Sequence, residues 1–138
     1  MNQSSILLVE DNDDDIFLMR RALVKANLTC AVQVVTDGQE AIDYLSGLEK
    51  YSDRSTYPLP EVIFLDLKLP YVHGFEVLMW LRQQACLKEI PVIILTSSPE
   101  ERDRQRAREL RARSYLVKPP TREMLIQAMQ SCQELLPA

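Results

Sequence analysis

Short β-branched apolar runs alternate with segments of helical spacing along this chain, and this alternation constrains its fold more than any other feature. Runs of this kind are typical of buried strands. Four of them are present, Ile6 to Val9, Val62 to Leu65, Val92 to Leu95 and Tyr115 to Val117. We expect these four runs to be central parallel strands. Between residues 31 and 36, Val32, Val34 and Thr36 share one side, which predicts a strand with a less buried face at an edge of the sheet.

The segments between these runs carry apolar residues three or four positions apart, as in amphipathic helices. They cover residues 16–26, 41–48, 74–85 and 125–136. Asp37 with Glu40 three residues later predicts one helix start, and the sequence Ser98-Pro99-Glu100-Glu101 predicts a second start with Ser98 as its cap.

Residues 100–113 carry many charges and few apolar side chains, which predicts a loosely docked helix. Glu100 with Arg104, and Glu109 with Arg113, have the spacing of weak surface ion pairs. An arginine-rich partner surface is the alternative interpretation of this charge pattern.

Five alternations of strand and helix predict a doubly wound α/β fold, with a parallel sheet covered by helices on both faces. A length of 138 residues with 46% hydrophobic content is sufficient for one core. We therefore expect a single domain over residues 1–138. The helical pattern lapses at about residues 46–60 into Gly, Ser, Asp and Pro, which predicts an extended loop.

Charge and composition exclude several classes of function. A net charge of −4 opposes attraction to the phosphates of nucleic acids, and the apolar runs are too short to cross a bilayer. Residues 1–5 have no features of a secretion signal, so we expect a cytoplasmic protein without nucleic acid or membrane as direct partners. Cys30, Cys86 and Cys132 have no paired spacing, which predicts buried, reduced thiols rather than disulfides or a zinc site.

Polar side chains follow four of the expected strands. They are the pair Glu10-Asp11, then Asp66, Thr96 and Lys118. Ligands of open α/β sheets bind beyond the carboxyl ends of the strands. If the first and third strands are neighbours, a strand spacing of about 4.8 Å brings Asp66 beside the acidic pair. Crowded carboxylates have raised pKa values or bind a cation, and hard oxygen ligands favour Mg²⁺.

A carboxylate can attack phosphorus and form an aspartyl phosphate, which makes Asp66 the candidate nucleophile. Lys118 would place a positive charge on the phosphoryl oxygens, and the Thr96 hydroxyl would donate a hydrogen bond to them. Simple capping of a helix is the alternative role for Glu10-Asp11. Asp11, Asp13 and Asp15 imitate part of a calcium loop, but that loop's required glycine and final glutamate are absent.

These residues resemble the receiver domain of two-component response regulators over essentially the whole chain. The family's acidic pair, phosphoacceptor, hydroxyl residue, aromatic switch residue and lysine match, in order, Glu10-Asp11, Asp66, Thr96, Tyr115 and Lys118. The resemblance implies a flavodoxin-like sheet of order 2-1-3-4-5 and a cis bond between Lys118 and Pro119. It also implies a site for Mg²⁺, or another divalent cation such as Mn²⁺, formed by Glu10, Asp11, Asp66 and the backbone carbonyl of Lys68.

The enlarged segment between Ser46 and Pro60, with no output domain expected, resembles the small regulators paired with cyanobacterial and other bacterial phytochromes. The resemblance implies a sensor histidine kinase as phosphodonor. We expect phosphorylation of Asp66 to act through Thr96 and Tyr115 on the surface of the helix at 100–113, the strand at 115–117 and the last helix. We also expect a homodimer through that surface.

Two other functions are possible on such a fold. A phosphatase with an aspartate nucleophile places a second acid two residues later, where this chain has Lys68. A flavin or nucleotide carrier needs a glycine-rich phosphate loop after the first strand, and none is present there. His73 is the only histidine, and we expect it in a solvated loop without a catalytic role. The sequence therefore favours a signalling protein over an enzyme.

Overall fold

A computed structural model describes residues 4–133 of the chain. Its five strands form one parallel sheet of order β2-β1-β3-β4-β5. The strands are β1 (Ser4–Val9), β2 (Cys30–Val35), β3 (Val62–Leu65), β4 (Val92–Thr96) and β5 (Ser114–Val117). The winding direction reverses between β1 and β3, so the predicted doubly wound, flavodoxin-like α/β fold is confirmed.

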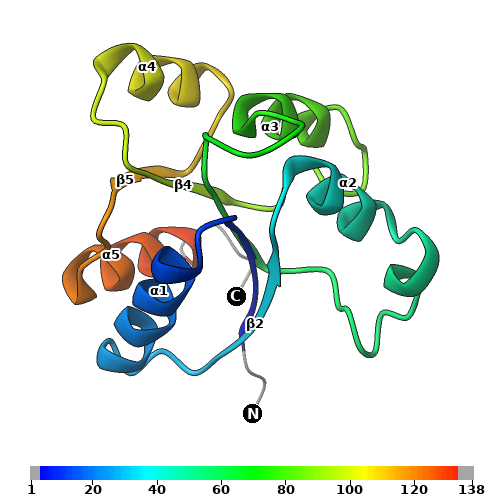
Figure 1. The fold of residues 1–138 in the computed structure, drawn as a ribbon, viewed down its shortest axis with the longest axis horizontal. Coiled ribbons are helices and arrows are strands. Elements are labelled where there is room, and N and C mark those ends of the chain that lie inside the picture. The colour runs from blue at the N-terminus through cyan, green and yellow to red at the C-terminus, as the bar shows by residue number, and fades with distance from the viewer. Residues whose placement is uncertain (1–3, 134–138) are drawn as a thin grey trace.

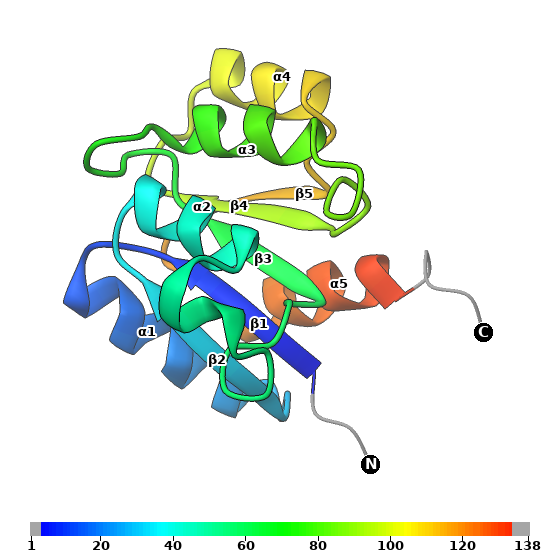
Figure 2. The ribbon, with the colours of Figure 1, turned by 90° about the vertical axis from the view of Figure 1, so that its right-hand side faces the viewer.

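Helices cover both faces of the sheet (Figures 1 and 2). They are α1 (Asp13–Lys25), α2 (Gly38–Ser46), α3 (Gly74–Arg82), α4 (Glu101–Glu109) and α5 (Arg122–Gln133). Side chains of α2, α3 and α4 pack on one face, and side chains of α1 and α5 pack on the other. Successive residues of β1 and β3 therefore contribute to opposite core clusters, because side chains alternate along a strand. The helical pattern predicted to reach residue 136 extends beyond the described residues.

Three of the four runs predicted as central strands are central, and the fourth is not. Every residue of β3 and β4 is buried, as expected for strands covered on both faces. β5 lies at the edge opposite β2, and its residues are only half-buried. The reason is that β5 has one neighbouring strand and is overlain by α4, whose only buried residue is Ala107. The prediction of a thin packing surface for this helix is confirmed.

The predicted helix starts have different outcomes. Asp37 caps α2 by accepting a hydrogen bond from the Glu40 backbone N–H at 2.7 Å, as predicted. Ser98 does not cap α4, which begins later, after Glu100. Instead, the Ser98 hydroxyl donates to Asp103 at 2.6 Å and accepts from the Glu100 N–H at 3.4 Å.

The two surface ion pairs predicted for the helix at 100–113 are replaced by others. The pairs present are Glu100 with Arg102, Glu101 with Arg108 and Glu109 with Arg106. The predicted arginines are engaged elsewhere, because Arg104 lies over the Tyr115 ring and Arg113 donates to the Ser131 carbonyl.

The segment at about residues 46–60 is more structured than the predicted extended loop. It contains a short 3₁₀ helix, η1 (Glu49–Ser52). Arg54 donates to the carbonyls of Tyr44 and Tyr57 from one nitrogen and to that of Leu45 from another, at 2.9, 3.2 and 3.1 Å. The segment is therefore attached to the carboxyl end of α2.

Three smaller expectations can also be compared with the structure. The bond between Lys118 and Pro119 is cis, as the resemblance implied. Cys132 is buried and Cys30 half-buried, but Cys86 is exposed, so the prediction of buried thiols is wrong for Cys86 because it lies on the loop after α3. Within residues 4–133, no helix is both long and apolar enough to cross a membrane.

Candidate functional site

The register of β1 and β3 brings two acidic residues together at the carboxyl end of the sheet. Val9 is paired with Leu65, so the next residues, Glu10 and Asp66, leave the sheet side by side. Backbone hydrogen bonds between the strands continue past both strand ends. The Asp66 N–H donates to the Val9 carbonyl at 3.1 Å, and the Glu10 N–H donates to the Val35 carbonyl at 3.0 Å. The main chain thus fixes where both carboxylates begin.

Three carboxylates converge at this point. One oxygen each of Glu10, Asp11 and Asp66 lies within 4.8 Å of the other two. Glu10 is 1% and Asp66 6% exposed, whereas Asp11 lies open to solvent. The cluster therefore has a buried floor and an accessible rim, as a site that exchanges ligands with solvent requires.

Lys118 lies within this cluster at the end of β5. Its Nζ is 2.6 Å from Glu10 Oε1, 2.9 Å from Asp66 Oδ2 and 2.9 Å from Asp15 Oδ2. Burial lowers the pKa of Lys118, but the hydrogen bonds to the three carboxylates outweigh burial and raise that pKa above its ordinary value. The lysine is therefore a permanent positive charge beside Asp66.

The three carboxylates of Glu10, Asp11 and Asp66 outnumber the single positive charge of Lys118, so the cluster has an excess of acidic groups. Burial is the main reason that the pKa of Glu10 is raised from 4.5 to about 6, and the neighbouring Asp66 charge adds to it, while Lys118 lowers it. Several hard oxygen donors with excess negative charge suit a small divalent cation such as Mg²⁺. The residues present fit the metal that the acidic cluster predicts, with Glu10, Asp11 and Asp66 as its side-chain ligands.

Thr96 lies at the end of β4, next to the lysine. The backbone N–H of Lys118 donates to the Thr96 carbonyl at 2.8 Å, and the Thr96 side chain is fully buried. Its hydroxyl accepts a long hydrogen bond from the Ser98 N–H at 3.5 Å. The Tyr115 hydroxyl donates to the Ser98 carbonyl at 2.7 Å. Ser98 thus links the two residues predicted to form the switch.

Lys68 lies at the mouth of the site with an exposed side chain. Its backbone N–H donates to Asp66 Oδ1 at 3.3 Å. The role of its carbonyl as a metal ligand stays a prediction.

The sequence did not identify Asp15 as part of this site. The sequence indicates Asp15 as part of a helix start or as one acid of an incomplete calcium loop, yet its carboxylate is the third partner of Lys118. The available signal was local, namely a helix start with Asn12 as cap and acids in the first turn. The contact itself joins residues 103 positions apart, which spacing cannot reveal.

His73 has a structural role that was also not predicted. Its Nδ1 accepts a hydrogen bond from the Phe75 N–H at 3.1 Å, and Glu76 accepts one from the His73 N–H at 3.4 Å. The residue lies exposed on the loop just before α3, as predicted, and in addition it caps that helix.

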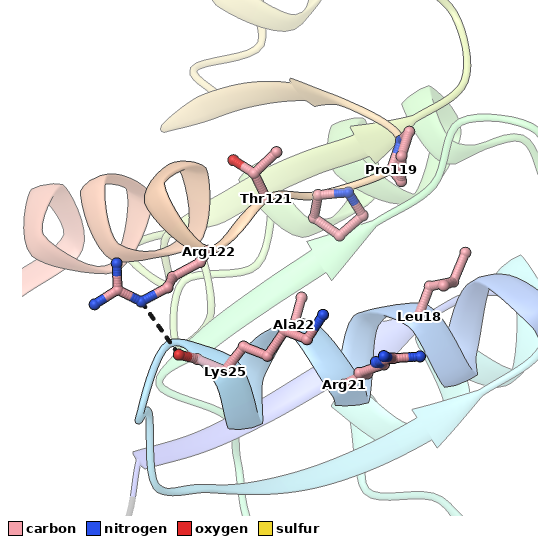
Figure 3. A pocket seen from close by; sticks show the side chains of 8 residues that line it. Leu18, Arg21, Ala22, Lys25, Pro119, Thr121 and Arg122 are labelled. Carbon is pink, nitrogen blue, oxygen red and sulfur yellow. Dashed lines mark hydrogen bonds between the residues drawn. The ribbon is translucent and has the colours of Figure 1, made fainter.

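A hollow of about 500 Å³ lies between α1 and the segment that follows β5 (Figure 3). Its lining includes Leu18, Arg21 and Lys25 of α1, and Arg122 bridges its end by donating to the Lys25 carbonyl at 3.2 Å. Pro119, the residue after Lys118, also lines this hollow. None of the predicted site residues lines the hollow, so it is a surface beside the carboxylate cluster rather than part of it.

One family model and several known proteins are similar to most of this chain. The family described as the response regulator receiver domain matches residues 6–130. The probable methanogenesis regulatory protein FilR2 of Methanothrix harundinacea is 39% identical over 94% of this chain and 81% of its own length. The response regulator Rcp1 of Synechocystis is 37% identical over 82% of this chain and 75% of its own length.

Similar solved structures include several regulators of phytochromes. The bacteriophytochrome response regulator AtBRR has a TM-score of 0.86 and 40% identity, covering 100% of this chain and 98% of its own. The phosphorylated cyanobacterial phytochrome response regulator RcpA has a TM-score of 0.79 and 35% identity, covering 96% and 93%. The Mn²⁺-bound form of Rcp1 has a TM-score of 0.78 and 32% identity, covering 98% and 99%.

Proposed function

The chain belongs to the receiver domain family of response regulators, and we propose from this that it accepts a phosphoryl group on Asp66 from a sensor histidine kinase. One observation carries the proposal. The buried Asp66 carboxylate lies beside two further carboxylates and 2.9 Å from the Lys118 ammonium. A receiver domain is a signalling module rather than a classical enzyme, so the phosphoryl group is the signal and not a substrate to be turned over.

In the proposed transfer, a carboxylate oxygen of Asp66 bonds to phosphorus while the bond between phosphorus and the histidine nitrogen of the kinase breaks. The leaving nitrogen keeps the electron pair of that bond. Lys118 and the Thr96 hydroxyl would meet the negative charge on the phosphoryl oxygens. Mg²⁺ or another divalent cation such as Mn²⁺, bound by Glu10, Asp11, Asp66 and the Lys68 carbonyl, would supply further neutralisation of that charge.

Lys68, two residues after Asp66, supports storage of the phosphoryl group over rapid hydrolysis. Phosphatases with an aspartate nucleophile use an acid at that position to protonate the leaving group and activate water. Lys68 cannot activate water in this way, because its ammonium has no lone pair to accept a proton. The acyl phosphate should therefore persist long enough to be read by another surface of the molecule.

We propose that this surface consists of α4, β5 and α5. Ser98 forms hydrogen bonds with Thr96, with Tyr115 and with Asp103 of α4. A displacement of the Thr96 hydroxyl toward the phosphoryl group would therefore disturb this shared hydrogen-bond network. Since RcpA and AtBRR are described as phytochrome response regulators, we propose a phytochrome-type kinase as donor. The cytoplasm is the proposed location, because a histidine kinase draws on the ATP that is present there.

The proposal is tested with acetyl phosphate and Mg²⁺, a donor that needs no kinase. Intact-mass analysis should show a single phosphate adduct on the wild-type protein and none on Asp66→Asn. Asp14→Asn is the matched control, because Asp14 is an exposed acid in the first turn of α1. Undiminished labelling of Asp66→Asn would rule out this acceptor.

A further inference from the structure

The Lys118 ammonium has all three of its protons engaged. An ammonium group donates at most three hydrogen bonds, and Nζ has three carboxylate partners, on Glu10, Asp15 and Asp66. The lysine side chain is 10% exposed, so little water is available as an alternative acceptor. The direction of each proton is thus set by the other two bonds.

Asp15 reaches the lysine from a different element than the other two acids. Glu10 and Asp66 follow strands of the sheet, whereas Asp15 belongs to the first turn of α1. That turn is fixed by Asn12, whose side chain accepts from the Asp15 N–H at 3.0 Å. Asp13 and Asp14 of the same turn are exposed, while the Asp15 side chain is 31% exposed and turned to the site.

Asp15 is distinct from the candidate metal ligands. The carboxylate oxygens that gather within 4.8 Å of one another come from Glu10, Asp11 and Asp66, and among the described residues Asp15 is not in that group. Its recorded side-chain partner is Lys118. A contribution of Asp15 to the chemistry would therefore act through the lysine.

We propose that Asp15 is a positioning residue that holds Lys118 for phosphoryl transfer. With two protons held by Glu10 and Asp15, the third is directed at Asp66 Oδ2, next to the place where phosphorus must arrive. Formation of the acyl phosphate removes the carboxylate charge of Asp66. The third N–H of the ammonium then donates its hydrogen bond to a phosphoryl oxygen instead. Glu10 and Asp15 keep the nitrogen in place throughout. The inference rests on the proposed function.

Substitution of Asp15 has two opposite effects, which a control must separate. Removing a negative charge favours the approach of an anionic donor, whereas freeing one ammonium proton loosens the lysine. Asp14→Asn removes the same formal charge one residue earlier without touching Lys118, so it measures the first effect. Asp15→Asn keeps an oxygen that can still accept a hydrogen bond, and Asp15→Ala keeps none.

The first measurement is the initial rate of phosphorylation by acetyl phosphate with saturating Mg²⁺. A charge-assisted hydrogen bond in a partly exposed position predicts a rate about tenfold lower for Asp15→Ala than for Asp14→Asn, with Asp15→Asn between them. Rates for both Asp15 variants equal to that of Asp14→Asn would overturn the proposal.

The second measurement is independent of phosphorylation. In ¹⁵N NMR spectra, the wild-type Lys118 ammonium should give a resolved signal with slow proton exchange, assigned by its loss in Lys118→Arg. Exchange should be faster in Asp15→Asn and unchanged in Asp14→Asn. Unchanged exchange in Asp15→Asn would refute the positioning role. If the wild-type protein takes up no phosphate, the proposed function fails, while this comparison still decides whether Asp15 holds the lysine.

Discussion

Glu10 is a nearly fully buried carboxylate whose protonation is coupled to folding. Its pKa is raised from 4.5 to about 6, chiefly by burial. Between these pH values the folded protein binds more protons than the unfolded chain, so the free energy of unfolding falls as pH rises through this window. A shift of this size corresponds to about 2 kcal/mol, all of it lost above the folded pKa.

We therefore predict how Glu10→Gln changes the pH dependence of stability in a metal chelator. The free energy of unfolding of the wild-type protein, minus that of the variant, should fall by about 2 kcal/mol between pH 4 and pH 7. Urea unfolding at several pH values measures this difference. Parallel pH profiles for the two proteins would show that Glu10 titrates normally in the folded state.

Gly74 shows how closely the backbone approaches the acceptor. A Cβ atom at this position would lie 2.3 Å from the Asp66 carbonyl oxygen and 2.7 Å from the Leu67 Cα. Only glycine permits this approach, because both neighbouring atoms are backbone and cannot move aside. The start of α3 thereby fixes the chain that carries Asp66.

At the scale of elements, the segment at about residues 46–60 depends on one arginine. Arg54 donates from two nitrogens to three carbonyls, two of them at the end of α2. We predict that Arg54→Lys lowers the free energy of unfolding by about 2 kcal/mol, because an ammonium lacks the planar fork that reaches several acceptors. The midpoint of urea unfolding measures the loss.

Arg102→Lys is the control for this prediction. Arg102 forms an ion pair with Glu100, but its side chain is 84% exposed, so the same exchange should change stability by less than about 0.5 kcal/mol. Equal effects of the two substitutions would mean that the bonds of Arg54 contribute no more than a surface pair.

The sequence predicts the elements better than their contacts. Apolar runs such as Val62 to Leu65 predict strands because burial on both faces requires continuous hydrophobicity. The acids and the lysine of the site are predictable for a related reason, since the carboxyl ends of parallel strands meet at one edge. The strand order and the switch pair Thr96 and Tyr115 came from family resemblance, not from spacing.

Contacts that depend on side-chain direction were not predictable. The bond between Asp15 and Lys118 joins a helix and a strand end far apart in sequence, and its geometry depends on the packing of α1. The same holds for Arg104, whose guanidinium lies over Tyr115 instead of pairing with Glu100. Helical spacing shows which pairs are within reach, but it cannot show a competing partner from another element.

For the whole molecule, we propose the surface of α4, β5 and α5 as the place where a phosphorylation signal changes association. Only Ala107 of α4 is buried, so this helix can shift at low cost in packing. Its exposed ion pairs, such as Arg108 with Glu101 at 2.9 Å, could be exchanged between two copies across a two-fold axis. A local change in Tyr115 and Ser98 would alter the position of these charges.

We therefore predict a homodimer through this surface that phosphorylation strengthens. In sedimentation experiments, phosphorylated wild-type protein should associate more than unphosphorylated protein, and Tyr115→Ala should abolish the difference. Arg108→Glu should weaken the dimer because it opposes like charges at the interface. Arg20→Glu, an equal change of charge on an exposed position of α1, should leave association unchanged. Loss of the dimer in Arg20→Glu but not in Arg108→Glu would place the interface at α1 instead of α4, and equal association of all samples would exclude the switch.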